Sequence, residues 1–174
     1  SLGSLENTFK AKLEILKHLK PDGTIVLNSD DDMLKNFKSS EFEVLFAGLK
    51  KENNPDVFAD NIENDEFSSH FEVNFRNSKF EVSLPILGKQ NILNSLLASL
   101  VCLKLGFTGS EIASALECFV ASPMRSEVSF VSGVKIIKDY YNASPESSKV
   151  AVENLANIKN DGKKIAILGE ISEL

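Results

Sequence analysis

Hydrophobic and polar residues follow two different periods along this chain, and these periods predict its helices and strands. Apolar residues recur every three or four positions in four segments, which is typical of helices with one buried face: residues 5–20, 91–105, 110–120 and 144–159. Short apolar runs predict strands in five others: residues 24–28, 43–49, 127–131, 134–139 and 164–168. Three aspartates after residue 29 predict the start of a further helix that runs to about residue 38.

Two stretches indicate how these elements are connected. Apolar and polar residues alternate on both sides of residues 76–78, which predicts a β-hairpin. The segment 121–123 is the best candidate for a linker. The strand, helix and strand predicted after it suggest a parallel unit. One such unit cannot cover its own sheet, so we expect a mixed α/β chain whose second domain is cut short.

Composition and charge narrow the class of protein. The chain has 174 residues, of which 43% are hydrophobic and 25% charged, the profile of a globular protein with a real core. Its formal net charge is −6 and it has no Lys/Arg-rich run, which argues against general nucleic-acid binding. The longest apolar run, residues 92–105, is too short to insert across a membrane. Cys102 and Cys118 lie in apolar segments, and we interpret them as buried thiols in a reducing cytoplasm.

Lys12 lies in the middle of an apolar stripe on the first predicted helix. At about 100° per residue, Leu5, Phe9 and Leu16 share this stripe. An ammonium group on an apolar face is costly unless it snorkels, pairs or loses its charge. One interpretation is a snorkelling or ion-paired lysine. The other is a buried lysine with a lowered pKa, whose neutral amine can react.

Asn91 and Asn94 lie three residues apart at the start of the long helix predicted at 91–105. Ser95 and Cys102 continue the same face with small side chains. Such a face lets another group approach closely, and two amides can both donate and accept hydrogen bonds, which suits the edge of an adenine base. Helix capping and tight helix packing explain the pattern equally well.

A polar segment follows the strand predicted at 134–139. Loops at the carboxyl ends of parallel strands bind ligands in open α/β sheets, and Asp139 there can accept hydrogen bonds from a ribose. Ser144 is explained by N-capping, because Pro145 suits the first position of a helix. Capping does not explain Asp139, Tyr141 or Asn142.

Arg125 and a run of three aspartates can each be interpreted as purely structural or as functional. Arg125 directly follows the linker candidate, where it is either a surface arginine or a group that reaches a phosphate across an interdomain cleft. Asp30, Asp31 and Asp32 are either metal ligands or favourable charges in the first turn of a helix. The chain contains no GxxxxGK[ST], GxGxxG or HExxH motif. Spacing alone therefore predicts only a nucleotide-compatible cleft between two α/β pieces.

Taken in order, the unusual segments resemble the Mur ligase family, in particular its members that add D-alanyl-D-alanine. The resemblance is carried by five short stretches spread over nearly the whole chain: residues 2–15, 26–31, 87–94, 141–147 and 168–174. It implies that residues 1–122 are the C-terminal half of a central ATP-binding domain. Residues 123–174 are then the first part of a Rossmann-like C-terminal domain.

The resemblance also implies an activity, its cofactors and its partners. In this family, ATP with Mg²⁺ phosphorylates a peptide carboxylate, and the amine of D-alanyl-D-alanine attacks the acyl phosphate. The carboxylate belongs to UDP-N-acetylmuramoyl-tripeptide, a peptidoglycan precursor. Since the phosphate loop is missing from this sequence and positioning supplies most of phosphoryl-transfer catalysis, we expect the chain alone to be inactive.

The resemblance assigns roles to the unusual residues. Lys12 is similar to a lysine that is carbamylated in related ligases and joins the magnesium site. Asn91 and Asn94 match asparagines that contact adenine. Arg125 resembles an arginine that reaches the nucleotide, and Asp139 an acidic residue that holds the ribose. Tyr141 and Asn142 are expected near the nucleotide or the incoming dipeptide.

Four positions depart from the family's usual residues. Gln90 stands where a histidine is common, Met124 where a glycine precedes the arginine, Lys138 where an acidic residue is usual, and Ser144 where an asparagine is usual. These departures concern details of nucleotide contact. Two alternative functions remain: a ligase that polyglutamylates folate, and a non-catalytic nucleotide-binding domain with the ligase fold. The element at residues 141–143 argues against the folate ligase.

Overall fold

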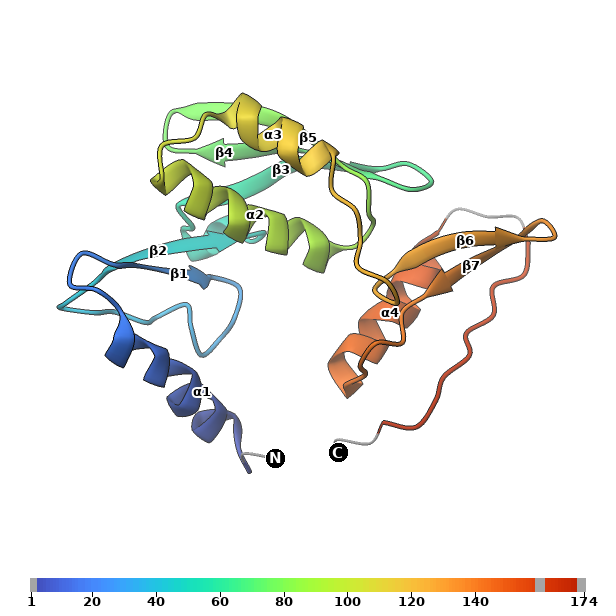
Figure 1. Cartoon of the computed structure of the whole chain (residues 1–174), viewed down its shortest axis with the longest axis horizontal. Helices are drawn as coiled ribbons and strands as arrows, with labels where there is room; N and C mark the ends of the chain where they lie inside the picture. The colour runs from blue at the N-terminus through green and yellow to red at the C-terminus, as the bar shows by residue number, and fades with distance from the viewer. Residues whose placement is uncertain (1–2, 159–161, 172–174) are drawn as a thin grey trace.

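The computed structural model describes residues 3–158 and 162–171, and a five-stranded sheet is its largest element (Figure 1). The strands are β1 (Thr24–Asn28), β2 (Glu43–Gly48), β3 (Val57–Asn64), β4 (Ser69–Phe75) and β5 (Ser78–Leu84). They lie in sequence order, with β1, β2 and β3 parallel and β3, β4 and β5 antiparallel. The hairpin predicted around residues 76–78 is confirmed as β4 and β5.

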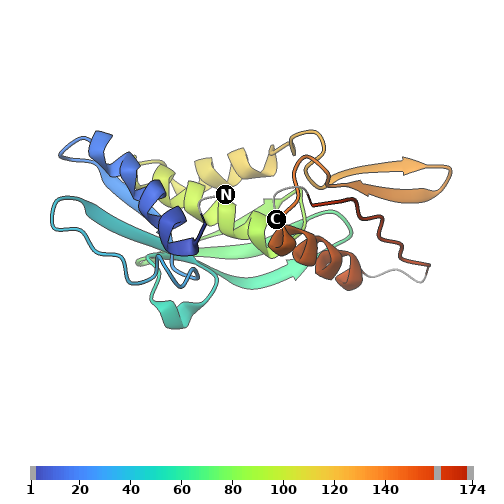
Figure 2. The same cartoon turned by 90° about the horizontal axis from the view of Figure 1, so that it is seen from below.

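Two helices cover one face of this sheet, α2 (Lys89–Lys104) and α3 (Gly109–Glu117) (Figure 2). Alternate strand residues point towards the helices, and the apolar stripe of α2 meets them. The most completely buried side chains of this core are Ala47, Val57, Phe71, Val73, Ile92, Leu96 and Leu100. The mixed α/β class expected from the sequence is confirmed.

The first predicted helix is α1 (Leu5–Leu13), which continues as the 3₁₀ helix η1 (Glu14–His18). Ser4 caps it, with its Oγ accepting a hydrogen bond from the Asn7 backbone N–H at 3.1 Å. Neither α1 nor η1 contains a buried residue. Of the two interpretations of Lys12, the buried lysine is wrong, because its side chain is exposed. The apolar stripe is only partly covered: Phe9 makes an edge contact with Phe37, with ring centres 6.4 Å apart.

Two predictions in the sheet region are corrected. The helix predicted up to residue 38 is a series of turns, because the Asp31 carboxylate accepts hydrogen bonds from the backbone of Met33 and Leu34 and closes a local turn. A single-turn 3₁₀ helix, η2 (Lys51–Asn53), precedes β3. Strand β3 was not predicted, because its register shifts between Asp60 and Glu63 and interrupts the alternation of apolar and polar residues.

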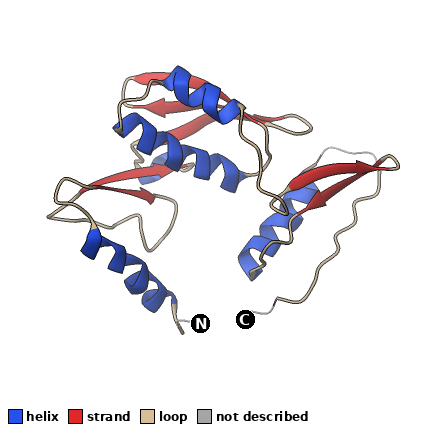
Figure 3. Cartoon of the chain, viewed as in Figure 1, coloured by secondary structure: helices blue, strands red, loops and turns tan. Residues whose placement is uncertain are grey.

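The second region contains an antiparallel hairpin, β6 (Glu127–Val131) and β7 (Val134–Lys138), followed by α4 (Pro145–Asn157). Ser144 caps α4 as predicted. The predicted last residue of this helix, Lys159, lies outside the described residues. Residues 164–168 form no strand, since no other described segment pairs with them (Figure 3). The parallel unit expected here is therefore absent from the described part of the chain.

The two regions touch at the turn between β3 and β4. The Lys135 Nζ of β7 donates a hydrogen bond to the Glu66 carbonyl at 2.9 Å and lies 4.3 Å from the centre of the Phe67 ring. Phe67 also makes an edge contact with Phe130 of β6, with ring centres 6.1 Å apart. No helix among residues 3–158 and 162–171 is long and apolar enough to cross a membrane.

Candidate functional site

A cleft of about 300 Å³ lies where α2 begins, α3 ends, β7 ends and α4 runs past. This volume is at the lower end of the range for small-molecule sites. Four of the residues predicted to bind a nucleotide lie on its wall: Asn91, Asn94, Arg125 and Asp139. Segments more than thirty residues apart in the sequence therefore line one cleft.

The α2 wall presents two amides near a helix N-terminus. Gly88 caps this helix with a φ of 108°, a conformation that favours glycine. The Asn91 Nδ2 donates to the Leu87 carbonyl at 2.7 Å, which fixes the orientation of this half-buried amide. Asn94, one turn further on, is exposed on the cleft.

The opposite wall joins the linker to the end of β7. The Asp139 carboxylate accepts hydrogen bonds from the Ser126 backbone N–H at 3.2 Å and from the Ser126 Oγ at 3.3 Å. Both residues line the cleft, and Asp139 is exposed. A carboxylate with this partner keeps further lone pairs with which it can accept hydrogen bonds from hydroxyl groups of a ligand.

Tyr141 and Asn142 are not on the described wall of the cleft. The Tyr141 ring stacks on Arg125, with the guanidinium carbon 4.3 Å from the ring centre. The Asn142 Oδ1 accepts a hydrogen bond from the Ala143 backbone N–H at 2.9 Å. Tyr141 is thus one contact away from the cleft, and Asn142 supports the turn into α4.

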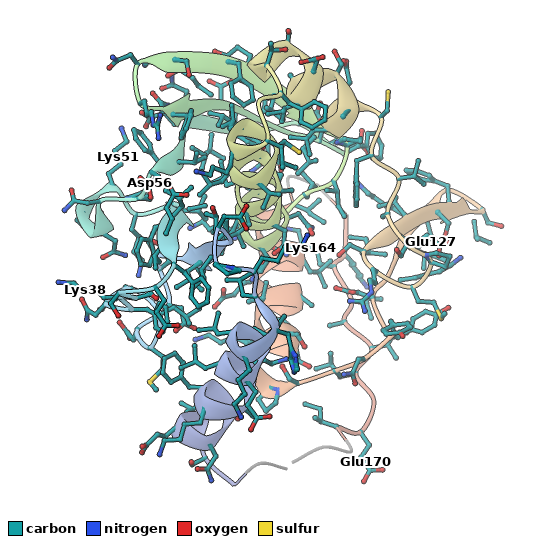
Figure 4. The ribbon with its side chains drawn as sticks, turned by 60° about the vertical axis from the view of Figure 1, so that its left-hand side comes forward. Lys38, Lys51, Asp56, Glu127, Lys164 and Glu170 are labelled. Carbon is teal, nitrogen blue, oxygen red and sulfur yellow. The ribbon has the colours of Figure 1, made fainter. Side chains whose placement is uncertain are left out.

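An ion pair joins the two strands of the hairpin at its open end, next in sequence to Ser126 and Asp139 of the cleft. Lys138 Nζ is 3.0 Å from the Glu127 carboxylate, which Figure 4 labels at the start of β6. The hydrogen bond from Lys138 lowers the pKa of the Glu127 carboxyl, helped by one from the Met124 backbone. The same bond to Glu127 raises the pKa of the Lys138 ammonium. Both groups therefore stay charged near neutral pH and hold the two strand ends together.

The aspartates after β1 have structural roles. Asp30 accepts hydrogen bonds from the backbone N–H groups of Leu49 and Lys50 and so fixes the loop after β2. Asp32 pairs with Lys35, and that hydrogen bond lowers the pKa of the Asp32 carboxyl. Within residues 3–158 and 162–171, no three His, Cys, Asp or Glu side chains are grouped to hold a metal ion.

Sequence reasoning missed the wall that α4 contributes. Ser147, Ala151 and Asn154 recur at four- and three-residue intervals on one face of this helix and line the cleft. Their spacing is a signal of a shared helix face, but polar residues at such spacing are common on solvated faces. Asn154 also packs closely on α2: a Cβ added to Gly88 would lie 2.9 Å from the Asn154 Nδ2.

The sheet, its two covering helices and this cleft define the class of protein. The family model of the Mur ligase middle domain matches residues 1–102, which is more than half of the chain. The chain therefore belongs to the Mur ligase family.

The similar proteins narrow the class further. A UDP-N-acetylmuramoyl-tripeptide–D-alanyl-D-alanine ligase of Bacillus subtilis is 33% identical over 174 residues, which is 99% of this chain and 37% of that protein. The corresponding ligase of Escherichia coli is 28% identical over 99% of this chain and 38% of its own length. The chain thus spans little more than a third of the curated relatives that it matches.

Solved structures of the same family superimpose on this chain. A MurF structure from Acinetobacter baumannii superimposes with a TM-score of 0.89 at 27% identity, covering 99% of this chain and 37% of that one. The MurF ligase of Thermotoga maritima, solved in complex with ADP, gives a TM-score of 0.77 at 30% identity, covering 89% of this chain and 35% of that one.

Proposed function

We propose that this chain is part of an ATP-dependent ligase that adds D-alanyl-D-alanine to UDP-N-acetylmuramoyl-tripeptide in the cytoplasm. The proposal is supported by relatives that carry this name and match nearly the whole chain. In it, residues 1–122 are the C-terminal half of the ATP-binding domain and residues 123–174 begin the C-terminal domain. The reaction forms an acyl phosphate from the tripeptide carboxylate, which the dipeptide amine then attacks.

The role of this chain in that reaction is to hold the nucleoside end of ATP. In our proposal, Asn91 and Asn94 meet the edge of the adenine, Asp139 accepts hydrogen bonds from the ribose hydroxyls, and Arg125 reaches a phosphate. The observation that carries the proposal is that these four side chains line one cleft although they come from separate segments. Asparagine amides can both donate to and accept from adenine, and guanidinium groups suit phosphate oxygens.

The groups that would bind Mg²⁺ and so activate the phosphates are separate from the residues that hold the nucleoside. Mg²⁺ would neutralise the phosphates in the intact ligase, but the described residues do not bring a set of metal ligands together. Lys12 as a carbamylated group at that metal remains part of the proposal. Its exposed side chain has room for the carbamate.

Nucleotide binding by this chain tests the proposal. ADP added to the ¹⁵N-labelled chain should shift the amide signals of α2's first turn and of residues 125–139. Asn94→Ala should weaken binding about five- to tenfold, the size of one lost hydrogen bond to a base. The control Asn36→Ala removes an exposed amide that lies on a different groove and should leave the affinity unchanged.

Turnover gives a second, independent test. The sequence has no GxxxxGK[ST] segment, so the chain alone should release no phosphate from ATP with the tripeptide precursor and D-alanyl-D-alanine. Clear phosphate release by the purified chain would contradict this. If ADP shifted no signal of the cleft, the proposed nucleotide role of these residues would be wrong.

A further inference from the structure

The turn that carries Arg125 is bound to the segment after β7 rather than to α2. The backbone N–H groups of Tyr140 and Tyr141 both donate to the Met124 carbonyl, at 3.1 and 3.2 Å. Ser126 donates twice to the Asp139 carboxylate, at 3.2 and 3.3 Å. Four hydrogen bonds therefore join residues 124–126 to residues 139–141, and the two segments form one unit.

The backbone on both sides of Arg125 adopts an unusual conformation. Met124 has a φ of 62° and Ser126 a φ of 52°, and both are in the left-handed region that side chains other than glycine rarely adopt. Such strain persists only where surrounding contacts hold it, and it is concentrated at functional sites. The four hydrogen bonds to residues 139–141 supply these contacts, so the turn is fixed in the shape that places Arg125 on the cleft.

The backbone of this turn does not fix the end of the Arg125 side chain. An exposed arginine samples many rotamers and loses entropy when it is held in one. Here the guanidinium lies on the face of the Tyr141 ring, with its carbon 4.3 Å from the ring centre. A cation on an aromatic face is attracted by the ring quadrupole, and a stacked guanidinium keeps its N–H edges available for an anion.

We propose that Tyr141 is a positioning residue that holds the Arg125 guanidinium at the cleft, ready for a phosphate group of the nucleotide. This inference rests on the proposed function for the identity of the ligand. It gives Tyr141 a role through Arg125, in place of the direct contact with nucleotide or dipeptide expected from the sequence. The aromatic ring is what matters, so the phenol hydroxyl is dispensable.

The composition of the chain allows a direct test of the stacking. The chain has two arginines, Arg76 and Arg125, so a sample labelled with ¹³C-arginine gives only two δ-methylene signals. The ring current of Tyr141 should displace the Arg125 signal. Tyr141→Leu should return it to the position of an unstacked arginine, whereas Tyr141→Phe should leave it displaced. Arg76 lies over the Phe75 ring at 4.9 Å and serves as an internal reference in every variant.

The chain also offers a matched control variant. Tyr140 is the neighbouring tyrosine and is 65% exposed, close to the 61% of Tyr141. Tyr140→Leu retains the backbone N–H that binds Met124 and should not move the Arg125 signal. If Tyr141→Leu left the Arg125 signal in place, or Tyr140→Leu moved it equally, the stacking role would be wrong.

Affinity measurements connect the stacking to the phosphate. Tyr141→Leu should weaken ADP binding about two- to fivefold, the effect of an exposed cation–π contact, and leave adenosine binding unchanged. Tyr141→Phe should match the unaltered chain, and Tyr141→Leu should have no further effect in an Arg125→Ala background. Equal ADP affinities of Tyr141→Leu and the unaltered chain would overturn the positioning role alone. An unaltered chain that bound neither ADP nor adenosine would overturn the proposed nucleotide role of the cleft, and the phosphate role of Tyr141 with it.

Discussion

The strands of the sheet and those of the hairpin are similarly apolar, yet their side chains differ sharply in burial. In β2, Leu45 is 7% exposed and Ala47 is fully buried, because α2 packs over them. In β6, Phe130 and Val131 are 58% and 56% exposed. After Ile112, every residue whose burial the structure describes is at least partly exposed.

The difference teaches where the stability of this chain resides. Burying apolar surface is the main favourable term in folding. Among residues 3–158 and 162–171, helices cover the five-stranded sheet, whereas the β6–β7 hairpin has no comparable cover. The hairpin and α4 are held by local hydrogen bonds, by the Glu127–Lys138 pair and by the contact of Phe67 with Phe130. A two-stranded hairpin is at best marginally stable by itself. We therefore expect changes in the first region to affect global unfolding and changes in the second to act locally.

A cavity in the core should have the largest effect on the free energy of unfolding. Leu100 of α2 is fully buried, and Leu100→Ala should reduce the free energy of unfolding by about 2–5 kcal/mol. The same substitution at Leu105, which is 71% exposed at the end of the helix, should change it by less than about 0.5 kcal/mol. Urea denaturation followed by circular dichroism measures both. Similar losses in the two variants would contradict the assignment of the core.

Overfilling the core should have the second-largest effect on the free energy of unfolding. A Cβ added to Gly48 would lie 2.0 Å from the Oγ of the buried Ser29, so Gly48→Ala should cost about 1–3 kcal/mol. Ser29→Ala in the same chain should restore part of this loss. In the second region, Gly169→Ala meets no described atom within 4 Å and should leave the urea midpoint unchanged.

The two helix caps provide the most closely matched pair. Thr108 and Ser144 each form a capping box, on α3 and on α4. Thr108→Ala should lower the global free energy of unfolding by about 0.5–2 kcal/mol, because α3 packs on the core. Ser144→Ala should instead speed hydrogen exchange of the first amides of α4 and leave the urea midpoint in place. A shift of the midpoint by Ser144→Ala would show that α4 unfolds together with the sheet.

The smallest effect concerns pH and the turn that joins the two regions. The hydrogen bond from His70, with backbone N–H groups of Phe67 and Ser68, lowers the pKa of the Asp65 carboxyl from 3.8 to about 2. A depressed pKa means that the stabilisation is complete above the ordinary value and is lost as the pH falls towards about 2. The Phe67 amide should therefore exchange faster as the pH falls over this range, beyond the intrinsic rate.

NMR titration of the Asp65 carboxyl carbon should give a midpoint near the lowered value. In Asp65→Asn, the Phe67 amide should lose this pH dependence. A midpoint near the ordinary value would show that the turn does not hold the carboxylate.

How far the sequence predicted the structure is clearest at particular elements. The helix predicted at 91–105 lies at Lys89–Lys104, within two residues at either end, because its apolar stripe repeats over four turns and packs on a sheet. The strand at 57–64 was missed, because the irregularity at Asn61, with a φ of 51°, removes the alternation on which the prediction depends. The strand predicted at 164–168 has the right composition and no described partner, and a strand needs hydrogen-bonded neighbours.

The candidate site shows the same division. The sequence singled out Asn91, Asn94, Arg125 and Asp139, and these residues line one cleft. It left open whether Lys12 snorkels or is buried, and the structure shows its side chain exposed. It did not indicate that α4 forms a wall. The stacking of Tyr141 on Arg125 joins two residues sixteen positions apart, so no local sequence pattern predicts it.

The sequence by itself determined most of the local elements, the caps at Ser4 and Ser144, and the polar residues worth testing. Hydrophobic periodicity and helix capping involve residues only a few positions apart, so both can be recognised in the sequence. The tertiary structure decided which apolar stripes are covered and which polar groups face one another. Burial and ligand geometry depend on segments far apart in sequence, whose approach is set by the packing of the whole sheet, its helices and the hairpin beside them.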